Sequence, residues 1–368
     1  MKVVIAAAGT GGHINPGIAI ANKIMKEEPN SKIIFIGTKR GLETNLVPRA
    51  GYELKTIDSY GISRELSLKN VKRLAKTIHS ITEAKNILKS FKPDLVIGTG
   101  GYICISVCIA AKKLKIPYII HESNVLPGVS TKILSKNAKK ILVGFKEAKN
   151  RLPKAKEIIF TGTPTKVKKI NLSKAEIDTK KQELGFLKEK PLILVFGGSQ
   201  GAQSINKSMT DIIKNKMNTN YQIIWAAGPE QYEKIKQDLL KENIDIDKLY
   251  GIKVMPYIYN MEEIMNIADL IVSRSGAMTV TEIENVGKPA IFIPFPFAAE
   301  NHQEYNARAL EKQNAAKVIL DKDLTAEALN ATIIELTKDR KLLEQMGENA
   351  HKLSIENVED KIYEELKM

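Results

Sequence analysis

The chain has 368 residues, a length typical of two domains, and its 43% hydrophobic and 27% charged residues are those of an ordinary globular protein. No run reaches the roughly 18 apolar residues of a membrane-spanning helix, and no signal-peptide pattern precedes the first strand, so we expect the chain to stay in the cytoplasm. The net charge of +14 is uneven, because residues 1–160 hold 28 Lys or Arg against 11 Asp or Glu. A basic half indicates a polyanionic partner. Without an RNA-binding aromatic motif, a helix-turn-helix or a zinc finger, an anionic membrane is favoured over nucleic acid.

The two cysteines give no sign of a metal site. Cys104 and Cys108 stand four residues apart in an apolar helical pattern, without a second pair or nearby histidines. We therefore expect two buried thiols in a reducing compartment. No Asp-x-Asp pair follows a predicted strand, which favours chemistry without a divalent metal.

Strand-like and helical patterns alternate through the first half of the chain. This rhythm is typical of β-α-β units in a doubly wound parallel sheet, whose ligands bind at the carboxyl ends of the strands. The predicted strands cover residues 2–7, 32–37, 94–98, 117–121 and 140–144.

The first predicted strand leads into a glycine-rich turn and a helix at residues 8–17. Glycines allow backbone N–H groups to approach a phosphate, and the start of a helix adds partial positive charge. The turn lacks the G-x-G-x-x-G spacing of dinucleotide sites. It contains His13, whose imidazole can act as a general base toward a hydroxyl, although a histidine that caps or packs the helix would fit equally well.

Two further polar turns follow later strands of this half. Residues 98–102, Gly-Thr-Gly-Gly-Tyr, fit either a second phosphate site or a tight structural turn. Residues 121–124, His-Glu-Ser-Asn, would reach the same edge of the sheet, although Ser and Asn are also common helix caps. Glu122 and Asn124 are therefore expected to lie in the same cleft as His13, and the identity of the general base stays open.

Residues 71–92 predict a basic amphipathic helix. On pattern alone, a helix packed on the sheet with a solvated basic face is favoured, and a helix lying on anionic lipid is the alternative. The apolar stripe consists of Val71, Leu74, Ile78, Ile81 and Leu88, and the basic residues are Lys72, Arg73, Lys76, Lys85, Lys89 and Lys92.

The second half repeats this organisation. Residues 153–173 mix Pro and Lys and predict an interdomain connection, and a polar helix is predicted at 174–184. A strand at 191–196 then leads into Gly-Gly-Ser-Gln-Gly-Ala at 197–202 and a helix, so we expect a second Rossmann-like domain. Further strands are predicted at 221–227, 253–258, 270–272 and 289–294, and a charged helical remainder follows to residue 368.

Two junctions of the second half carry polar groups suited to a nucleotide sugar. Residues 273–279 place small residues at the start of an apolar helix, where N–H groups can bind an anion. Glu282 lies one to two turns further on and can accept hydrogen bonds from a ribose diol, although a solvated helix carboxylate is the simpler alternative. Residues 300–304, Glu-Asn-His-Gln-Glu, open another helix and can contact sugar hydroxyls.

Six motifs occur in order along the chain and together resemble one family. They are Gly-Thr-Gly-Gly-His-Ile-Asn-Pro-Gly, Gly-Thr-Gly-Gly-Tyr, His-Glu-Ser-Asn, Gly-Gly-Ser-Gln-Gly-Ala, Arg-Ser-Gly-Ala-Met-Thr-Val-Thr-Glu and Asn-His-Gln-Glu. The chain is thereby similar to the MurG family, the UDP-N-acetylglucosamine–N-acetylmuramyl-(pentapeptide) pyrophosphoryl-undecaprenol N-acetylglucosamine transferases. The resemblance covers essentially the whole chain.

The resemblance implies a B-type glycosyltransferase fold, in which two Rossmann-like, doubly wound parallel-sheet α/β domains face a cleft. It implies an acceptor- and membrane-facing domain at residues 1–162, onto which a C-terminal helix at about residues 345–368 packs back. The UDP-sugar-binding domain would cover residues 163–344. The implied reaction inverts the anomeric carbon and needs no metal or other cofactor.

The resemblance also implies roles for single residues. His13 matches the family histidine suspected as the general base. Lys166 stands where the family usually has an arginine, and because lysine lacks the bidentate fork, no role is carried over to it. In the implied donor site, the diphosphate is held by Ser199 and by the turn of Ala277, Met278 and Thr279. The backbone of Ile258 contacts uracil, and Glu282 binds the ribose hydroxyls. The sugar is surrounded by Gln303, Thr10, Gly11, Gly12 and Asn124.

The implied substrates are UDP-N-acetylglucosamine and lipid I, the undecaprenyl-diphosphate-linked muramyl-pentapeptide. Transfer to its 4-hydroxyl gives lipid II for peptidoglycan synthesis. A lipid acceptor shifts the balance for residues 71–92 toward contact with anionic inner-leaflet lipid. We therefore expect a peripheral enzyme on the cytoplasmic side of the cell membrane, with no nucleic-acid partner.

Three alternatives stay open on the sequence. A UDP-N-acetylglucosamine 2-epimerase would share the fold and the donor, and incubation with the donor alone would reveal it. A nicotinamide oxidoreductase would bind its cofactor, although the fingerprint for it is missing. A membrane-associated adaptor that senses sugar nucleotide would bind the ligand without turnover.

Overall fold

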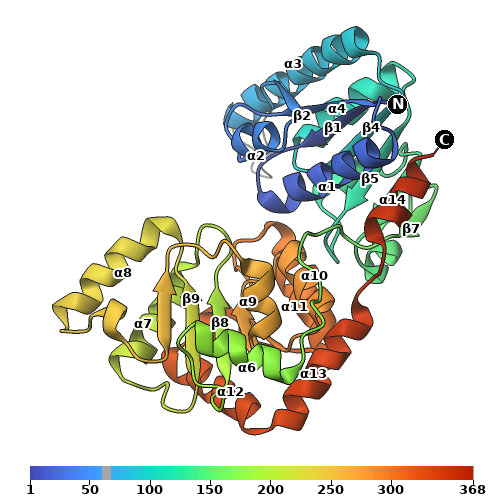
Figure 1. Cartoon of the computed structure of the whole chain (residues 1–368). Helices are drawn as coiled ribbons and strands as arrows, with labels where there is room; N and C mark the ends of the chain where they lie inside the picture. The colour runs from blue at the N-terminus through green and yellow to red at the C-terminus, as the bar shows by residue number, and fades with distance from the viewer. Residues whose placement is uncertain (60–67, 368) are drawn as a thin grey trace. The chain divides into compact units, whose positions relative to one another are not determined.

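The computed structural model describes the backbone of residues 1–59 and 68–367 and the side chains of residues 1–59 and 79–367. The chain divides into two compact units (Figure 1). Unit 1 comprises Met1–Thr165 and Ile355–Met368, and unit 2 comprises Lys166–Ser354. Both are α/β units built on a parallel sheet, as the alternating pattern predicts. The assignment of acceptor and donor to the predicted domains 1–162 and 163–344 stays a prediction.

Unit 1 is a doubly wound seven-stranded sheet in the order β3-β2-β1-β4-β5-β6-β7. Chain order reverses between β1 and β4, and this switch point is where such sheets bind ligands. Residues 3–7 of β1 and 95–98 of β4 are apolar and buried, as expected for a sheet covered on both faces. The strands are β1 (Lys2–Ala7), β2 (Lys32–Gly37), β3 (Glu53–Thr56), β4 (Leu95–Gly100), β5 (Tyr118–Glu122), β6 (Lys140–Val143) and β7 (Ile158–Phe160).

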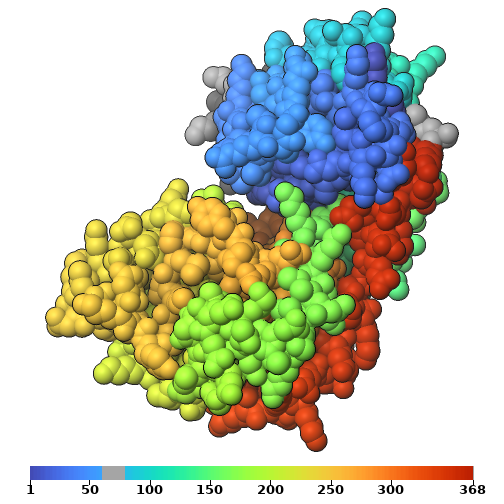
Figure 2. Space-filling model, viewed as in Figure 1, coloured from blue at the N-terminus to red at the C-terminus, as the bar shows by residue number. Residues whose placement is uncertain are grey.

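The helices of unit 1 cover both faces of this sheet. Helix α14 lies beside α1, at the red and blue surfaces in the upper right of Figure 2. Tyr363 of α14 donates a hydrogen bond to Glu28 at 2.9 Å, and Lys23 of α1 pairs with Asp360. The helical segments are α1 (Gly11–Glu27), α2 (Glu43–Arg49), α3 (Leu68–Phe91), α4 (Ile103–Lys113), α5 (Val129–Leu134), the 3-10 helix η1 (Lys146–Arg151) and α14 (Val358–Leu366).

Helix α3 is the basic amphipathic helix predicted at residues 71–92. Its described C-terminal half packs on α4, where Ala84 and Leu88 are fully buried and Ile81 is partly buried. Lys89 and Lys92 are exposed, so this half has the apolar face on the core and the basic face in solvent. The side chains of Val71, Leu74 and Ile78, and of the basic residues among them, lie outside the described residues.

Unit 2 repeats the design with a six-stranded parallel sheet in the order β10-β9-β8-β11-β12-β13. Its switch point lies between β8 and β11. The strands are β8 (Leu192–Phe196), β9 (Gln222–Ala226), β10 (Ile252–Met255), β11 (Leu270–Ser273), β12 (Ala290–Phe292) and β13 (Ala316–Val318). The helical segments are α6 (Lys174–Glu183), α7 (Gln203–Lys214), α8 (Pro229–Lys241), η2 (Ile246–Lys248), α9 (Met261–Ile267), α10 (Ala277–Val286), η3 (Ala299–Asn301), α11 (His302–Glu311), η4 (Asp321–Asp323), α12 (Ala326–Lys338) and α13 (Arg340–Leu353).

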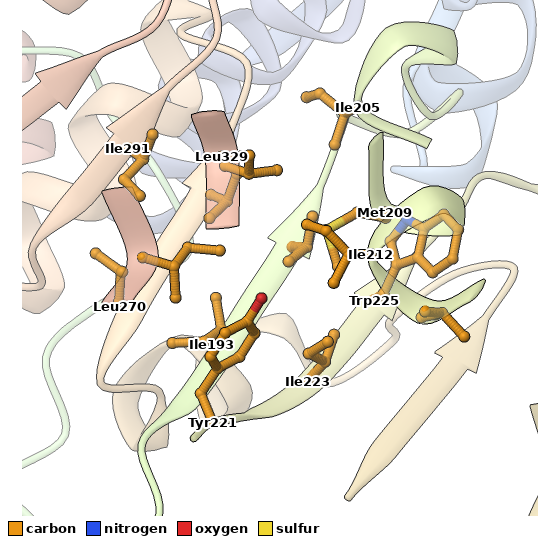
Figure 3. Packing of buried hydrophobic residues seen from close by; sticks show 14 of the residues in the cluster. Ile193, Ile205, Met209, Ile212, Tyr221, Ile223, Trp225, Leu270, Ile291 and Leu329 are labelled. Carbon is orange, nitrogen blue, oxygen red and sulfur yellow. The ribbon is translucent and has the colours of Figure 1, made fainter. Parts of the chain in front are cut away.

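The core of unit 2 joins its central strands to helices α7 and α12. Figure 3 shows Ile193 and Ile223 of the sheet packed with Met209 and Ile212 of α7. Trp225 is fully buried, and its indole N–H donates to Asn206 at 3.1 Å. A polar tip thus finds a partner inside an apolar cluster.

The sequence pattern does not predict three of the strands, and all three lie at the edge of a sheet. Strands β3, β7 and β13 have three or four residues and half-exposed side chains, so they lack a buried apolar run. Strand β7 lies inside residues 153–173, which were predicted to be a connection only. Strand β13 interrupts the helical remainder predicted after residue 294.

The prediction of buried thiols is confirmed. Cys104 and Cys108 are both free and buried in α4, and burial raises the pKa of the Cys104 thiol to about 12. A thiol of that pKa is protonated at neutral pH and poor as a nucleophile. Within the part of the chain that is described, no helix is both long and apolar enough to cross a membrane.

Candidate functional site

The glycine turns of both units lie at the switch points of the two sheets. In unit 1, residues 8–12 follow β1, and residues 100–102 lie at the end of β4, its neighbour in the sheet. In unit 2, residues 197–202 follow β8 and residues 274–276 follow β11, again neighbouring strands. Because the strands are parallel, the turns of each pair share one edge of their sheet, which is the position where doubly wound sheets hold ligands.

His13 lies in the first turn of α1 and its ring orientation is fixed. Its Nδ1 lies 3.0 Å from the carbonyl oxygen of Ala8. The backbone carbonyl oxygen of His13 accepts a hydrogen bond from the Thr99 hydroxyl at 2.8 Å. A carbonyl oxygen only accepts, so Nδ1 carries the proton and Nε2 is the basic nitrogen of the neutral ring. The imidazole is half-buried. This arrangement suits a general base.

The second glycine turn of unit 1 is shaped by its contact with the first. Gly100 has a φ of +136°, and a Cβ atom there would lie 2.2 Å from Cδ2 of His13. Gly101 has a φ of +84°, and a Cβ atom there would lie 2.6 Å from the carbonyl oxygen of Ala8. Both positions therefore require glycine. These contacts favour the structural explanation of residues 98–102, since the glycines make room for the His13 ring and the carbonyl that holds it.

The polar residues at the end of β5 form hydrogen bonds with one another and with the loop that follows. Glu122 is buried and accepts hydrogen bonds from the backbone and side-chain N–H groups of Asn124, at 3.0 Å each. It also accepts from the Gly128 N–H at 2.9 Å and the Thr131 hydroxyl at 2.7 Å. Both oxygens of Glu122 are thus engaged by the loop that carries Asn124, and Glu122 fixes the conformation of that loop.

His121 has a structural environment as well. It is 1% exposed, and its Nε2 lies 3.0 Å from the carbonyl oxygen of Gly162, beside the end of β7. Burial lowers the pKa of this imidazole, so the ring is neutral near pH 7.

Glu43 is a residue near this turn that the sequence did not single out. It is fully buried at the start of α2. Its Oε2 accepts the Gly9 N–H at 2.9 Å, and its Oε1 accepts the Thr38 N–H at 2.9 Å and the Thr38 hydroxyl at 2.6 Å. In the sequence it resembles an ordinary acidic residue at a helix start, and only the glycines around it at 37 and 41 hint at its burial.

In unit 2, the turn after β8 leaves Ser199 exposed above closely packed glycines. A Cβ atom at Gly197 would lie 2.3 Å from the Ala202 nitrogen, and one at Gly201 would lie 2.1 Å from the Ala227 carbonyl oxygen. Gly201 also has a φ of +77°. The chain therefore bends sharply at this point, which places Ser199 next to the start of α7.

The turn after β11 rests on a buried ionic network. The Arg274 guanidinium, 9% exposed, donates to the carbonyl oxygens of Ile293 and Pro294 at 3.0 and 3.1 Å. It also pairs with Asp321 at 2.5 Å and donates to the Ser204 hydroxyl of α7 at 2.9 Å. Arg274 thus fixes the backbone from which α10 begins, rather than reaching a ligand.

The starts of α10 and α11 are linked in unit 2. The buried Ser275 hydroxyl donates to the Gln303 carbonyl oxygen at 2.8 Å, and Asn306 donates to the Ser275 carbonyl oxygen at 3.2 Å. The side-chain oxygen of Gln303 accepts the Phe295 N–H at 3.0 Å, which leaves its amide NH₂ to donate. The structure therefore brings Gln303 close to the turn that carries Ala277, Met278 and Thr279.

The remaining predicted residues are distributed over the two units. Ile258 is buried in the loop between β10 and α9, Glu282 is half-buried on α10, and Lys166 is exposed. In unit 1, Thr10 is exposed, and Gly11 and Gly12 open α1 directly before His13. No group of three His, Cys, Asp or Glu side chains fit to hold a metal ion occurs among the described residues.

The chain matches two models of one protein family. The glycosyltransferase family 28 N-terminal domain matches residues 3–143, and the C-terminal domain of the same family matches residues 192–362. These ranges contain all the glycine turns described above.

Relatives of known name match over the whole length. The UDP-N-acetylglucosamine–N-acetylmuramyl-(pentapeptide) pyrophosphoryl-undecaprenol N-acetylglucosamine transferase of Acetivibrio thermocellus is 44% identical over 100% of this chain and 98% of its own length. The enzyme of the same name from a Thermoanaerobacter species is 45% identical, over 100% and 99%. The crystal structure of Acinetobacter baumannii MurG is 28% identical with a TM-score of 0.79, covering 100% of this chain and 99% of that one. The chain therefore belongs to glycosyltransferase family 28 and, within it, to the MurG type.

Proposed function

We propose that this enzyme transfers N-acetylglucosamine from UDP-N-acetylglucosamine to the 4-hydroxyl of the muramyl-pentapeptide of lipid I, giving lipid II and UDP. The oxygen of the acceptor hydroxyl forms a new bond to the anomeric carbon. The bond from that carbon to the diphosphate oxygen breaks, and its electron pair leaves with UDP. Attack from the opposite face inverts the configuration, and the hydroxyl proton passes to a base.

The observation that carries this proposal is the pair of glycine turns at the switch point of each sheet. The chain that holds these turns is 44–45% identical, over its full length, to relatives named as this transferase. The turns in unit 2 open helices of ten and twelve residues, and neither first turn contains an acidic residue. Such helix starts attract a diphosphate. The turn in unit 1 instead presents an oriented histidine.

On the donor side, the proposed contacts belong to unit 2. Ser199 and the N–H groups of Ala277, Met278 and Thr279 would hold the diphosphate and stabilise the negative charge that grows on it as UDP leaves. The backbone of Ile258 would read uracil and Glu282 would accept hydrogen bonds from the ribose hydroxyls. The free amide NH₂ of Gln303 would donate to the sugar.

On the acceptor side, His13 is the proposed general base and Nε2 the atom that takes the proton. The turn of Thr10, Gly11 and Gly12 would approach the N-acetylglucosamine, together with Asn124. Its lack of side-chain bulk allows the two reacting sugars to come close.

Purified protein is expected to transfer label from radiolabelled UDP-N-acetylglucosamine to a short-chain lipid I analogue. Other UDP-sugars serve as controls for the donor. Formation of UDP-N-acetylmannosamine from the donor alone would favour an epimerase instead, and donor binding without turnover in the presence of the acceptor would favour an adaptor.

We further propose that unit 1 binds the anionic cytoplasmic face of the cell membrane, where the lipid acceptor resides. The charge of residues 1–160, with 28 Lys or Arg against 11 Asp or Glu, supports this, since each basic residue near an anionic surface contributes about 1 kcal/mol. Nucleic acid is not a proposed partner. Exposed lysines near the C-terminal ends of α3 and α4 include Lys89, Lys112 and Lys113.

Reversal of these three lysines to glutamate is expected to weaken sedimentation with phosphatidylglycerol vesicles strongly at low salt, because three positive charges become negative and the net charge falls by six. Binding of the unchanged protein should itself decline with rising salt. The matched control reverses the exposed unit 2 lysines Lys234, Lys241 and Lys248. Equal losses in both variants would contradict a membrane face on unit 1.

A further inference from the structure

The peptide group between Ala8 and Gly9 is hydrogen-bonded at both of its ends to ionisable side chains. Its N–H, on Gly9, donates to Oε2 of Glu43 at 2.9 Å. Its carbonyl oxygen, on Ala8, accepts from Nδ1 of His13 at 3.0 Å. One peptide unit therefore connects a buried carboxylate with the imidazole of the proposed base.

We propose that Glu43 is a positioning residue for His13 that acts through the Ala8–Gly9 peptide. A carboxylate at the N–H end draws the amide into its charge-separated form and places more negative charge on the Ala8 oxygen, because consecutive hydrogen bonds polarise one another. That oxygen then holds the Nδ1 proton more firmly and favours the tautomer in which Nε2 is basic. The same polarisation stabilises the imidazolium that forms when Nε2 takes a proton.

The surroundings of Glu43 are built for a carboxylate. Cβ atoms at Gly37 and Gly41 would lie 2.7 and 2.0 Å from its side chain, so both glycines make room for it. Burial raises the pKa of the Glu43 carboxyl, but the hydrogen bonds from the Thr38 hydroxyl and from backbone N–H groups outweigh it and bring the pKa below its ordinary value. Glu43 is therefore ionised at neutral pH, as the coupling requires.

The other end of the coupling is equally constrained. Gly101 lies against the Ala8 carbonyl, and Gly100 lies against the His13 ring, at distances that leave no room for a Cβ atom. The second glycine turn therefore packs directly against the ring and against the carbonyl that accepts its Nδ1 proton. Geometry thus holds the ring nitrogen, the peptide and the carboxylate in one line of hydrogen bonds.

The inference rests on the proposed role of His13 as base, but its test does not depend on activity. Long-range ¹H–¹⁵N correlation spectra of ¹⁵N-histidine-labelled protein distinguish protonated from unprotonated ring nitrogens. They are recorded about two pH units above the ordinary histidine pKa of about 6.5, so that the ring is neutral. The chain has five histidines, and the spectrum of His13→Gln assigns the signal.

In the unchanged protein, His13 is expected to be protonated at Nδ1 and unprotonated at Nε2. In Glu43→Gln, which keeps the shape and removes the charge, the Nδ1–H population at His13 should fall and the Gly9 amide proton should move upfield. The matched control is Thr38→Val, which removes a hydroxyl donor to the same carboxylate but leaves its charge and the bond to Gly9. His13 should keep its Nδ1 proton in this control.

Two results would overturn the inference. One is a dominant Nε2–H tautomer in the unchanged protein, a measurement that needs no variant to fold. The other is an unaltered His13 spectrum in folded Glu43→Gln, which would leave Glu43 as a clamp for the loop and no more.

Kinetics then separate the inference from the proposed function. Glu43→Gln is expected to lower kcat roughly 10- to 100-fold, the size of effects from residues that orient a functional histidine. The dissociation constant of UDP should change little, because the contacts proposed for UDP lie in unit 2. If His13→Gln kept full turnover while the tautomer responded to Glu43, the base assignment would fail and the coupling would stand.

Discussion

Replacement of His13 by alanine is expected to lower kcat by roughly 10²- to 10⁴-fold, the usual contribution of a general base. The acceptor hydroxyl would then have to lose its proton to water during attack on the anomeric carbon. The dissociation constant of UDP should stay unchanged, because the residues proposed to hold it belong to unit 2. Steady-state transfer to a lipid I analogue measures the first quantity and isothermal titration calorimetry the second.

His79 provides the matched control for this variant. It is an exposed histidine on α3, with 71% of its side chain accessible, and its described pairing is with Glu83 one turn further along the same helix. His79→Ala should keep turnover within about twofold. Retention of turnover in His13→Ala would remove His13 as the base. Since Glu122 already accepts four hydrogen bonds, that result would direct attention to a base outside its loop.

The extent of agreement between sequence and fold follows from where each strand lies in its sheet. A central strand such as β1 or β8 has an almost entirely buried, apolar run that is visible in the sequence. An edge strand such as β3 has polar and half-buried residues, because one side of it meets solvent. Its pairing with β2 is decided by tertiary contacts. No local pattern reports such contacts.

The candidate site was predictable where it depends on chain order alone. A strand, a glycine turn and a helix in succession put His13 and Ser199 at strand ends, and parallel pairing brings the turns of each unit to one edge. What the sequence could not provide is the partner of each glycine. Gly100 fits a binding loop as well as a packing contact until the His13 ring is placed against it. Glu43 stayed unnoticed for the same reason, since its importance depends on a bond to a residue 34 positions away.

Arg274 has a structural role inside a motif that is proposed to bind the donor. It directly precedes the small residues at the start of α10, where a cation would suit a diphosphate. Its guanidinium instead donates to two carbonyl oxygens, to Ser204 and to Asp321, all within unit 2. The proposed phosphate contacts of this turn therefore come from backbone N–H groups and from the helix start.

Replacement of Asp321 by alanine is expected to destabilise unit 2 by about 3 kcal/mol, because it leaves Arg274 without its counter-ion in a buried site. The side chains of Arg274 and Asp321 are 11% and 21% exposed, respectively. The partial exposure of Asp321 keeps the expected loss of stability at the low end of the range for buried pairs. The loss should also weaken UDP binding, since Arg274 holds the backbone from which α10 begins. Trp225 is the only tryptophan and is fully buried in unit 2, so its fluorescence during urea unfolding reports this unit alone.

The matched control for Asp321 breaks an ion pair of the same unit that lies in solvent. Arg340 and Glu344 of α13 are 70% and 60% exposed, and such pairs contribute little to stability because water screens them. Glu344→Ala should therefore leave the urea midpoint of the Trp225 signal nearly unchanged. If Asp321→Ala behaved in the same way, the carbonyl oxygens of Ile293 and Pro294 would be sufficient to hold the guanidinium. The network would then position α10 through hydrogen bonds to the backbone, without a requirement for a paired charge.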